Sequence, residues 1–359
     1  MISDRRLHIS NLLSERPGER AAGEAIAPPT TPQRALTNGH ANNAGPRPIT
    51  RFVENGREYY AYGDRVVYPL PCDDVELERL DALHSMIHER ALNNRLVNAE
   101  LDWQAQRRLH ILDVGYGTGI WANDLARLNT NISVVGIDLC SNSPARSDDT
   151  PNATFVAPLD FTQPDWGFQP ASFDLIRMSQ LSGCVPDWLQ LYSTALRYLR
   201  AGDGFIEHIE IDWALRSLHN TEVTPGMRAV QEWWSLMCQA SSLLNGSMAY
   251  REDTAELLLA AGFTDLNHRM IRIPLQASPR DARDYLLKRW YIGIMCGDDH
   301  RHNSMNSFEA LSMSLFTRQL QMHPDAVRQL CQNVREAYKA NRAPFFHNIH
   351  IWTARKPVS

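Results

Sequence analysis

"HILDVGYGTGIWANDLA" (residues 110–126) decides the fold, because an apolar run breaks at three glycines and then resumes with helical spacing. The residues before the glycines are typical of a buried strand, and those after them recur like one face of an amphipathic helix. Gly115, Gly117 and Gly119 place no Cβ between the turn and a ligand, and they permit backbone angles that other residues avoid. The stretch therefore predicts a strand, a tight turn and a helix, with a cofactor lying over the turn.

Strands and helices alternate along the rest of the chain. The expected strands cover residues 110–115, 132–138, 153–156, 173–178, 204–211, 262–275 ("GFTDLNHRMIRIPL" at its core) and 348–357 ("NIHIWTARKP"). The expected helices cover residues 74–100, 119–128, 187–199, 226–243 and 253–261, the first capped by Asp73 or Asp74. This rhythm predicts an α/β fold with a parallel, doubly wound sheet, an N-terminal helix and a helical insert, about 279–342, before the last strand.

Composition restricts the class of protein. The chain has 359 residues, of which 43% are hydrophobic, and this suits one large domain over residues 49–359 behind a disordered tail over residues 1–48. The formal charge of −5 supplies no basic footprint for nucleic acid, and no apolar run is long enough for membrane insertion. The six cysteines contain no C-x-x-C pair, so we expect free thiols and no metal site.

One short apolar cluster stands out in the tail. It reads "RRLHISNLLSE" (residues 5–15), and its apolar residues fit one face of a short helix. It is either a helix that docks on a partner or a chance cluster in a tail.

Acidic residues surround the glycine turn in a regular way. Asp113 precedes it, where a carboxylate favours a sulfonium and an α-amino group over a pyrophosphate. Asp138, followed by Leu139, ends the second expected strand at the position that accepts hydrogen bonds from ribose hydroxyls. Asp160 and Phe161 follow the third strand, placed for an adenine amino group and ring. This layout is that of S-adenosylmethionine binding in class I methyltransferases.

A dinucleotide-dependent dehydrogenase is the weaker alternative for the turn. Its fingerprint has a third glycine for close packing of helix on strand, and Ile120 stands at that position.

Six segments together resemble the LaeA-like fungal class I methyltransferases, over residues 57–357. They read "YYAYGDRVVYPLPCDDVELERLD", "ILDVGYGTGIWANDLA", "FDLIRMSQLSGCV", "GFIEHIEIDW", "AGFTDLNHRMIRIPL" and "NIHIWTARKP". Two features depart from that family: Tyr116 replaces the usual Cys or Thr, and the segment "MSQLSGCVPDW" differs.

The resemblance implies a regulator of fungal development and secondary metabolism that uses S-adenosylmethionine. It also implies protein partners, either a velvet-type complex or a second methyltransferase subunit, and a location in the nucleus and cytoplasm, with membrane recruitment only through a partner.

The sequence shows no catalytic triad, and methyl transfer from a sulfonium does not require one, because positioning supplies most of the acceleration. The catalytic residues are therefore unassigned, with His208 and Glu210 as candidates on the fifth strand. Two functions stay open: an active enzyme, or a cofactor-binding regulatory subunit with little turnover. The acceptor is equally open between a histone, another protein and a small metabolite.

The insert over residues 279–342 also has two interpretations. It is expected to close over the cofactor site as a cap and partner surface, and the alternative is a static appendage at the far edge of the sheet.

Overall fold

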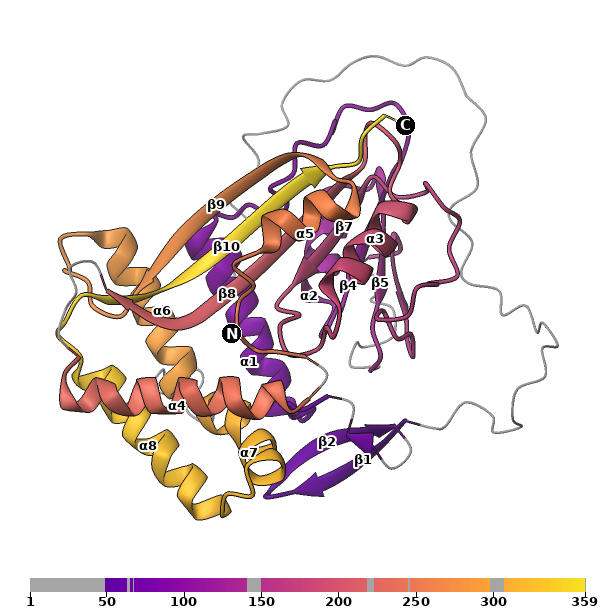
Figure 1. Ribbon diagram of the computed structural model, residues 1–359. Helices are drawn as coiled ribbons and strands as arrows, with labels where there is room; N and C mark the ends of the chain where they lie inside the picture. Colours follow the sequence, from indigo (N-terminus) through magenta and orange to yellow (C-terminus); the bar gives the residue numbers. More distant parts are fainter. Residues whose placement is uncertain are drawn as a thin grey trace.

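A seven-stranded sheet forms the centre of the computed structural model (Figure 1). The structure describes residues 49–62, 65–66, 68–140, 150–217, 223–244, 246–297 and 307–358. The strands lie side by side in the order β6-β5-β4-β7-β8-β10-β9. Their bounds are β4 (Leu109–Val114), β5 (Ile132–Ile137), β6 (Ala153–Val156), β7 (Leu175–Ser179), β8 (Phe205–Ser217), β9 (Thr264–Pro274) and β10 (Phe345–Arg355). Each expected strand is present, and the α/β class is confirmed.

The direction of β10 limits the predicted parallel arrangement to the strands from β6 to β8. From β6 to β8 neighbouring strands run parallel, whereas β10 runs antiparallel to both β8 and β9. Phe346 at the start of β10 pairs with Pro274 at the end of β9, because the insert leaves and re-enters the sheet at the same edge. Because β10 starts beside the end of β9, it has to run in the direction opposite to β9.

Helices cover both faces of the parallel strands. On one face α2 (Ile120–Leu128) packs on β4 and β5, and on the other face α3 (Trp188–Tyr198) and α5 (Thr254–Ala261) pack on β4, β7 and β8. Every residue of β4 is buried as a result. Burial on both faces explains why apolar residues of this strand, Leu109, Ile111, Leu112 and Val114, point to both faces of the sheet rather than to one.

The N-terminal helix ends earlier than predicted. It begins as α1 (Asp74–Ser85), with the Asp73 side chain accepting the Glu76 N–H, and continues as the π-helix η2 (Met86–Ala91). Asn93 and Asn94 then adopt positive φ angles of 53° and 62°, which ends the helix. The expected cap at Asp73 is confirmed, whereas the expected extension to residue 100 is wrong.

Four helices form a second layer beside the carboxyl end of β8. They are α4 (Pro225–Ser242), α6 (Ala282–Cys296), α7 (Ser307–Gln319) and α8 (Pro324–Ala340). The last three are the predicted insert, and they share one core with α4, η2 and the second half of β8. Trp233 of α4 donates to Ser312 of α7 and packs edge-to-face on Phe308. The insert is thus a packed module, and its role as a cap stays a prediction. In the described part of the chain no helix is both long and apolar enough to cross a membrane.

A hairpin that is not among the predicted elements precedes α1. It pairs β1 (Ile49–Glu54) with β2 (Arg57–Tyr62), and β3 (Arg65–Val66) adds a short third strand. Asn55 and Gly56 form the turn with positive φ angles, the known signature of Asn-Gly hairpins. Glu54 pairs with Arg318 of α7 at 2.8 Å, so the hairpin is attached to the insert (Figure 1). The predicted tail, its apolar cluster and residues 298–306 lie outside the described residues.

Candidate functional site

The three glycines after β4 all have left-handed backbone angles, but their surroundings differ. The φ angle is +71° at Gly115, +58° at Gly117 and +78° at Gly119. A Cβ added at Gly115 would lie 2.5 Å from Cδ2 of Leu181, so this glycine permits close packing. A Cβ added at Gly117 would meet no atom within 4 Å. Gly117 therefore faces open space at the carboxyl edge of the sheet, where ligands of such folds bind.

Asp138 lies beside this turn, as the sequence predicted. It follows the last residue of β5, and its carboxylate accepts the Gly117 N–H at 2.9 Å and the Cys140 N–H at 3.0 Å. Burial raises the pKa of Asp138 to about 6, although the backbone N–H donors of Cys140 and Gly117 act in the opposite direction. A carboxylate held in this way has remaining lone pairs for hydroxyl donors of a ligand.

Asp113 is placed differently from the prediction. It was expected to neutralise a cationic ligand, but it is buried and pairs with Arg177 of β7 at 2.8 Å. The Arg177 guanidinium also stacks over Trp121 of α2, with its Cζ 4.3 Å from the ring centroid. Burial raises the pKa of Asp113, and the charge of Arg177 opposes that rise. The cation that compensates Asp113 is therefore a side chain of the protein itself.

The residues expected near an adenine ring lie at the same edge but are engaged within the protein. The Asp160 carboxylate accepts the Thr162 N–H at 3.0 Å and its hydroxyl at 2.6 Å. Phe161 is buried, and its ring approaches within 3.6 Å of the Cβ position at Gly115. Leu139 is half-buried and packs in a small cluster with Cys140. Phe161 thus packs against the glycine turn, and its ring offers little exposed surface to a ligand.

The two catalytic candidates come together but are not open to a substrate. Glu210 and His208 are 3% and 2% exposed, and Glu210 Oε1 lies 3.3 Å from His208 Nε2. The Glu210 carboxylate accepts the N–H groups of Leu181 at 2.6 Å and Ser182 at 3.1 Å, while His208 Nδ1 lies 2.8 Å from the Tyr192 hydroxyl. Glu210 thereby holds the loop after β7, and His208 links Glu210 to Tyr192 of α3. This geometry argues against either as the general base.

The N-terminal helix contributes to the turn in a way that the sequence analysis missed. The Thr118 hydroxyl donates to Asp81 of α1 at 2.6 Å, which ties the glycine turn to that helix. Burial raises the pKa of Tyr68, just before α1, well above its usual value, and the Asp138 charge adds to this shift. The available signal was the Thr between two glycines, whose hydroxyl needs a nearby acceptor.

Comparisons with known proteins place this edge in context. A family profile described as "Methyltransferase domain" matches residues 84–268, just over half of the chain, which include the glycine turn. The "Secondary metabolism regulator LAE1" of Cochliobolus heterostrophus is 34% identical over 314 residues, covering 87% of this chain and 97% of that protein. The "Protein-methionine methyltransferase laeA" of Emericella nidulans is 31% identical over 310 residues, covering 85% and 76%. Among solved structures, the cyclase SpnF is similar with a TM-score of 0.43 and 18% identity, covering 78% of this chain and 82% of that one.

The Asp113–Arg177 pair leads to a stability prediction. Arg177→Met leaves the buried carboxylate without its cation, and we expect the free energy of unfolding to fall by about 3–5 kcal/mol at neutral pH. The folded protein already holds the pKa of Asp113 above its usual value, and losing Arg177 raises it further. The loss should therefore shrink as pH falls, because a protonated Asp113 buries no charge. Urea titrations across pH measure this.

The matched control is Arg127→Met, which breaks a surface pair with Asp124 whose side chains are 48% and 37% exposed. Its effect should stay below about 1 kcal/mol. Equal losses in both variants, or a loss at Arg177 that does not vary with pH, would contradict the buried-pair interpretation.

Proposed function

Because the chain belongs to the LaeA family of S-adenosylmethionine-dependent methyltransferases, we propose that it methylates a protein acceptor in the control of fungal secondary metabolism and development. The relatives named above are described as a secondary metabolism regulator and a protein-methionine methyltransferase. The assignment of the cofactor site rests on one observation. The backbone at Gly117 has open space in front of it and lies beside the Asp138 carboxylate.

The residues at the carboxyl edge fit this cofactor. Gly117 leaves room for a ligand against the backbone of the turn. Asp138 offers lone pairs for ribose hydroxyls, and Leu139 follows it at the same edge. Together these residues form a cradle for the cofactor. Gly115, Gly119, Asp160 and Phe161 shape this cradle through the contacts described above. Asp113 compensates the charge of Arg177 beneath it.

The cofactor, when bound, supplies an electrophilic methyl group on a sulfonium. A methionine thioether would take the methyl group with a lone pair while the bond from the methyl carbon to the cofactor sulfur breaks and a neutral thioether leaves. It has no proton to lose, so this acceptor requires no general base. The two candidate bases of the chain, His208 and Glu210, are buried and hydrogen bonded internally. What the chain then has to do is orient the acceptor and exclude water at the carboxyl edge. A thioether acceptor is consistent with both the geometry and the name of the Emericella relative.

The same buried pair favours a second candidate function. A subunit that binds the cofactor but turns over slowly also needs no accessible base. We further propose action within a complex, of the velvet type or with a second methyltransferase subunit, in the nucleus and cytoplasm. The support for this part is the regulatory name of the relatives together with the sequence resemblance.

The cradle leads to a binding prediction with a matched control. Gly117→Leu places a side chain in the open space over the turn, so we expect cofactor binding to be lost. Gly56→Leu introduces a side chain at a similar φ, +82°, again with no atom within 4 Å of the Cβ, but in the hairpin turn. Both variants carry comparable left-handed backbone strain. Calorimetry with S-adenosylmethionine should show binding only in the Gly56 variant, and equal binding in both would contradict the cradle.

Asp138 leads to a prediction about pH. Its ionised carboxylate is the form that accepts ribose hydroxyls, and its pKa of about 6 means that protonation begins near neutral pH. Affinity for the cofactor should therefore fall as pH drops through about 6. Asp138→Asn should weaken binding at pH 8 by about 1–3 kcal/mol and flatten the pH dependence. Asp325→Asn, on an exposed carboxylate of α8, is the control and should leave the profile unchanged. An unchanged profile in the Asp138 variant would remove this residue from the site.

The acceptor is tested with the full chain, labelled cofactor and fungal extract proteins, followed by mass spectrometry of the labelled peptides. We expect the label on methionine, and none in reactions with the Gly117→Leu variant. Label on lysine, arginine or a small metabolite would contradict the thioether acceptor. Cofactor binding without label on any acceptor would favour the regulatory subunit.

A further inference from the structure

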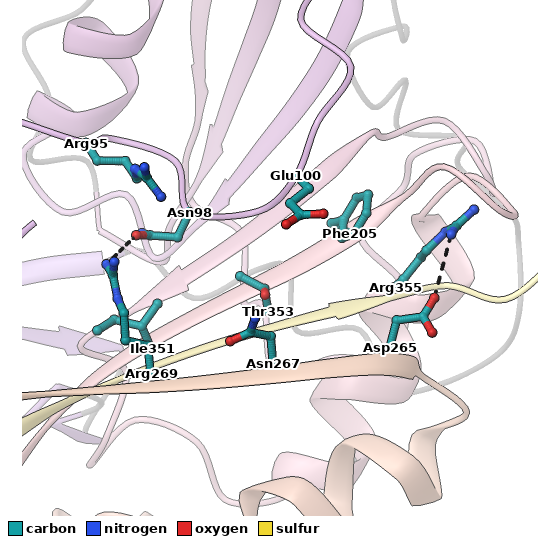
Figure 2. Close-up of a pocket in the computed structure, with 10 residues that line it drawn as sticks. All are labelled: Arg95, Asn98, Glu100, Phe205, Asp265, Asn267, Arg269, Ile351, Thr353 and Arg355. Atoms are coloured by element: carbon teal, nitrogen blue, oxygen red, sulfur yellow. Dashed lines mark hydrogen bonds and ion pairs between the residues drawn. The ribbon is translucent and has the colours of Figure 1, made fainter.

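A hollow lies between the segment after η2 and the sheet, away from the sheet edge that carries the glycine turn (Figure 2). Its volume is about 360 Å³. Phe205, the first residue of β8, and Thr353 and Arg355 near the end of the antiparallel β10 place it toward the amino edge of the parallel strands. The glycine turn lies at the opposite edge. The hollow is therefore separate from the site described above.

One end of the hollow is basic. Arg95 and Arg269 line it, and the Arg269 guanidinium donates to Asn98 Oδ1 at 2.8 Å (Figure 2). Arg283 lies nearby at the start of α6 and donates to the Ala91 carbonyl oxygen at 3.1 Å. Burial lowers the pKa of Arg269, and the neighbouring positive charges of Arg95 and Arg283 lower it further, while the Glu207 charge acts in the opposite direction. Three positive charges therefore lie near one another at this end.

No carboxylate of the described residues forms an ion pair with these three arginines. Glu207, which lies close to Arg269, is buried and accepts the backbone N–H groups of Asn98 and Ala99. At the other end of the hollow, Arg355 does have a partner, Asp265, at 3.6 Å (Figure 2). In a chain whose formal charge is −5, a group of arginines without a close ion pair to the described carboxylates favours an anionic ligand.

We propose that this hollow and the adjoining edge of β9 bind an acidic, extended segment of a partner protein. The proposal rests on the assembly with protein partners proposed above and gives that assembly a surface. Arginine donors match carboxylates in a fork geometry, and arginine is enriched in protein interfaces.

The form of the hollow favours a polypeptide over a small molecule. Eight of its ten lining residues are polar or charged, whereas small-molecule sites are enclosed and mostly apolar. β9 is the terminal strand of the sheet, and its residues 264, 265 and 267–270 are exposed. An added strand pairs with such an edge through main-chain hydrogen bonds.

The alternation of side chains along a strand fixes the charge pattern of the segment. Asp265, Asn267 and Arg269 share the face of β9 that lines the hollow. A residue opposite Arg269 on an added strand would lie within reach of that guanidinium. Glu100 lies between the two ends of the hollow, so the acidic residues of the partner belong at the arginine end (Figure 2).

The test uses the full chain and two fluorescent synthetic peptides, one alternating Glu and Thr and the other alternating Gln and Thr. Anisotropy titrations at low salt should show binding of the Glu peptide and, for the Gln peptide, an affinity weaker by about tenfold or more. The double variant Arg95→Gln/Arg269→Gln should lose that preference. A proline in the middle of the Glu peptide should also abolish binding, because it removes a ladder hydrogen bond.

The control is Arg127→Gln/Arg328→Gln, two exposed arginines on α2 and α8 that should leave peptide binding unchanged. Equal binding of the two peptides by the native chain, or an equal loss in both double variants, would overturn the proposal. Displacement of the Glu peptide by an equal concentration of inorganic phosphate would also overturn it, in favour of a small-anion site. Cofactor binding and methyl transfer, measured on the same variants, should be unaffected. Failure of the native chain in these two assays would count against the proposed function rather than against this surface.

Discussion

The ion pair between Asp113 and Arg177 is the interaction on which the cofactor edge depends. It joins β4 to β7, the two central strands between which the strand order of the sheet reverses. Ligands bind at such switch points because the loops after the two strands diverge and leave a crevice. Two opposite charges buried together hold the strands in register, and Trp121 covers the guanidinium from α2. The glycine turn begins two residues after Asp113, so this pair fixes where the turn stands.

Other carboxylates, buried or partly buried, shape the rest of the molecule by accepting backbone N–H groups. Asp138 holds the glycine turn, Glu210 holds the loop after β7, Glu207 holds the segment after η2, and Asp174 accepts the His110 N–H at 2.7 Å. A buried carboxylate is costly unless it is fully hydrogen bonded, and loop N–H groups need acceptors that no strand supplies. The N–H groups supply the hydrogen bonds that the carboxylates need, and the carboxylates supply the acceptors that the N–H groups need. This explains why acidic residues in or beside the apolar strands here mark structural junctions rather than a catalytic base.

The sequence predicted what depends on local pattern. Strand β5 and the helix after the glycines follow from periodicity, and Gly117 and Asp138 follow from the spacing of the turn and the end of the next strand. What it did not predict depends on partners distant in the chain. That Arg177 would take the carboxylate of Asp113, which lies 64 positions earlier, is not encoded in either local segment. The direction of β10 depends in the same way on where the insert re-enters the sheet. The Asn55-Gly56 hairpin is different, since its signal, the Asn-Gly pair, is local.

Strand β8 connects the two surfaces considered above. Glu207 near its start holds the Asn98 and Ala99 N–H groups, in the segment that forms one wall of the arginine hollow. Glu210, three residues further along, holds the Leu181 and Ser182 N–H groups beside the glycine turn. Successive side chains of a strand point to opposite faces, so the two carboxylates act on opposite sides of the sheet. A partner that displaces the segment after η2 changes the contacts of Glu207, and it affects methyl transfer only if β8 has a second arrangement that also changes the contacts of Glu210. Without such an arrangement, a partner bound at the hollow would change where the enzyme acts and leave its chemistry unaltered.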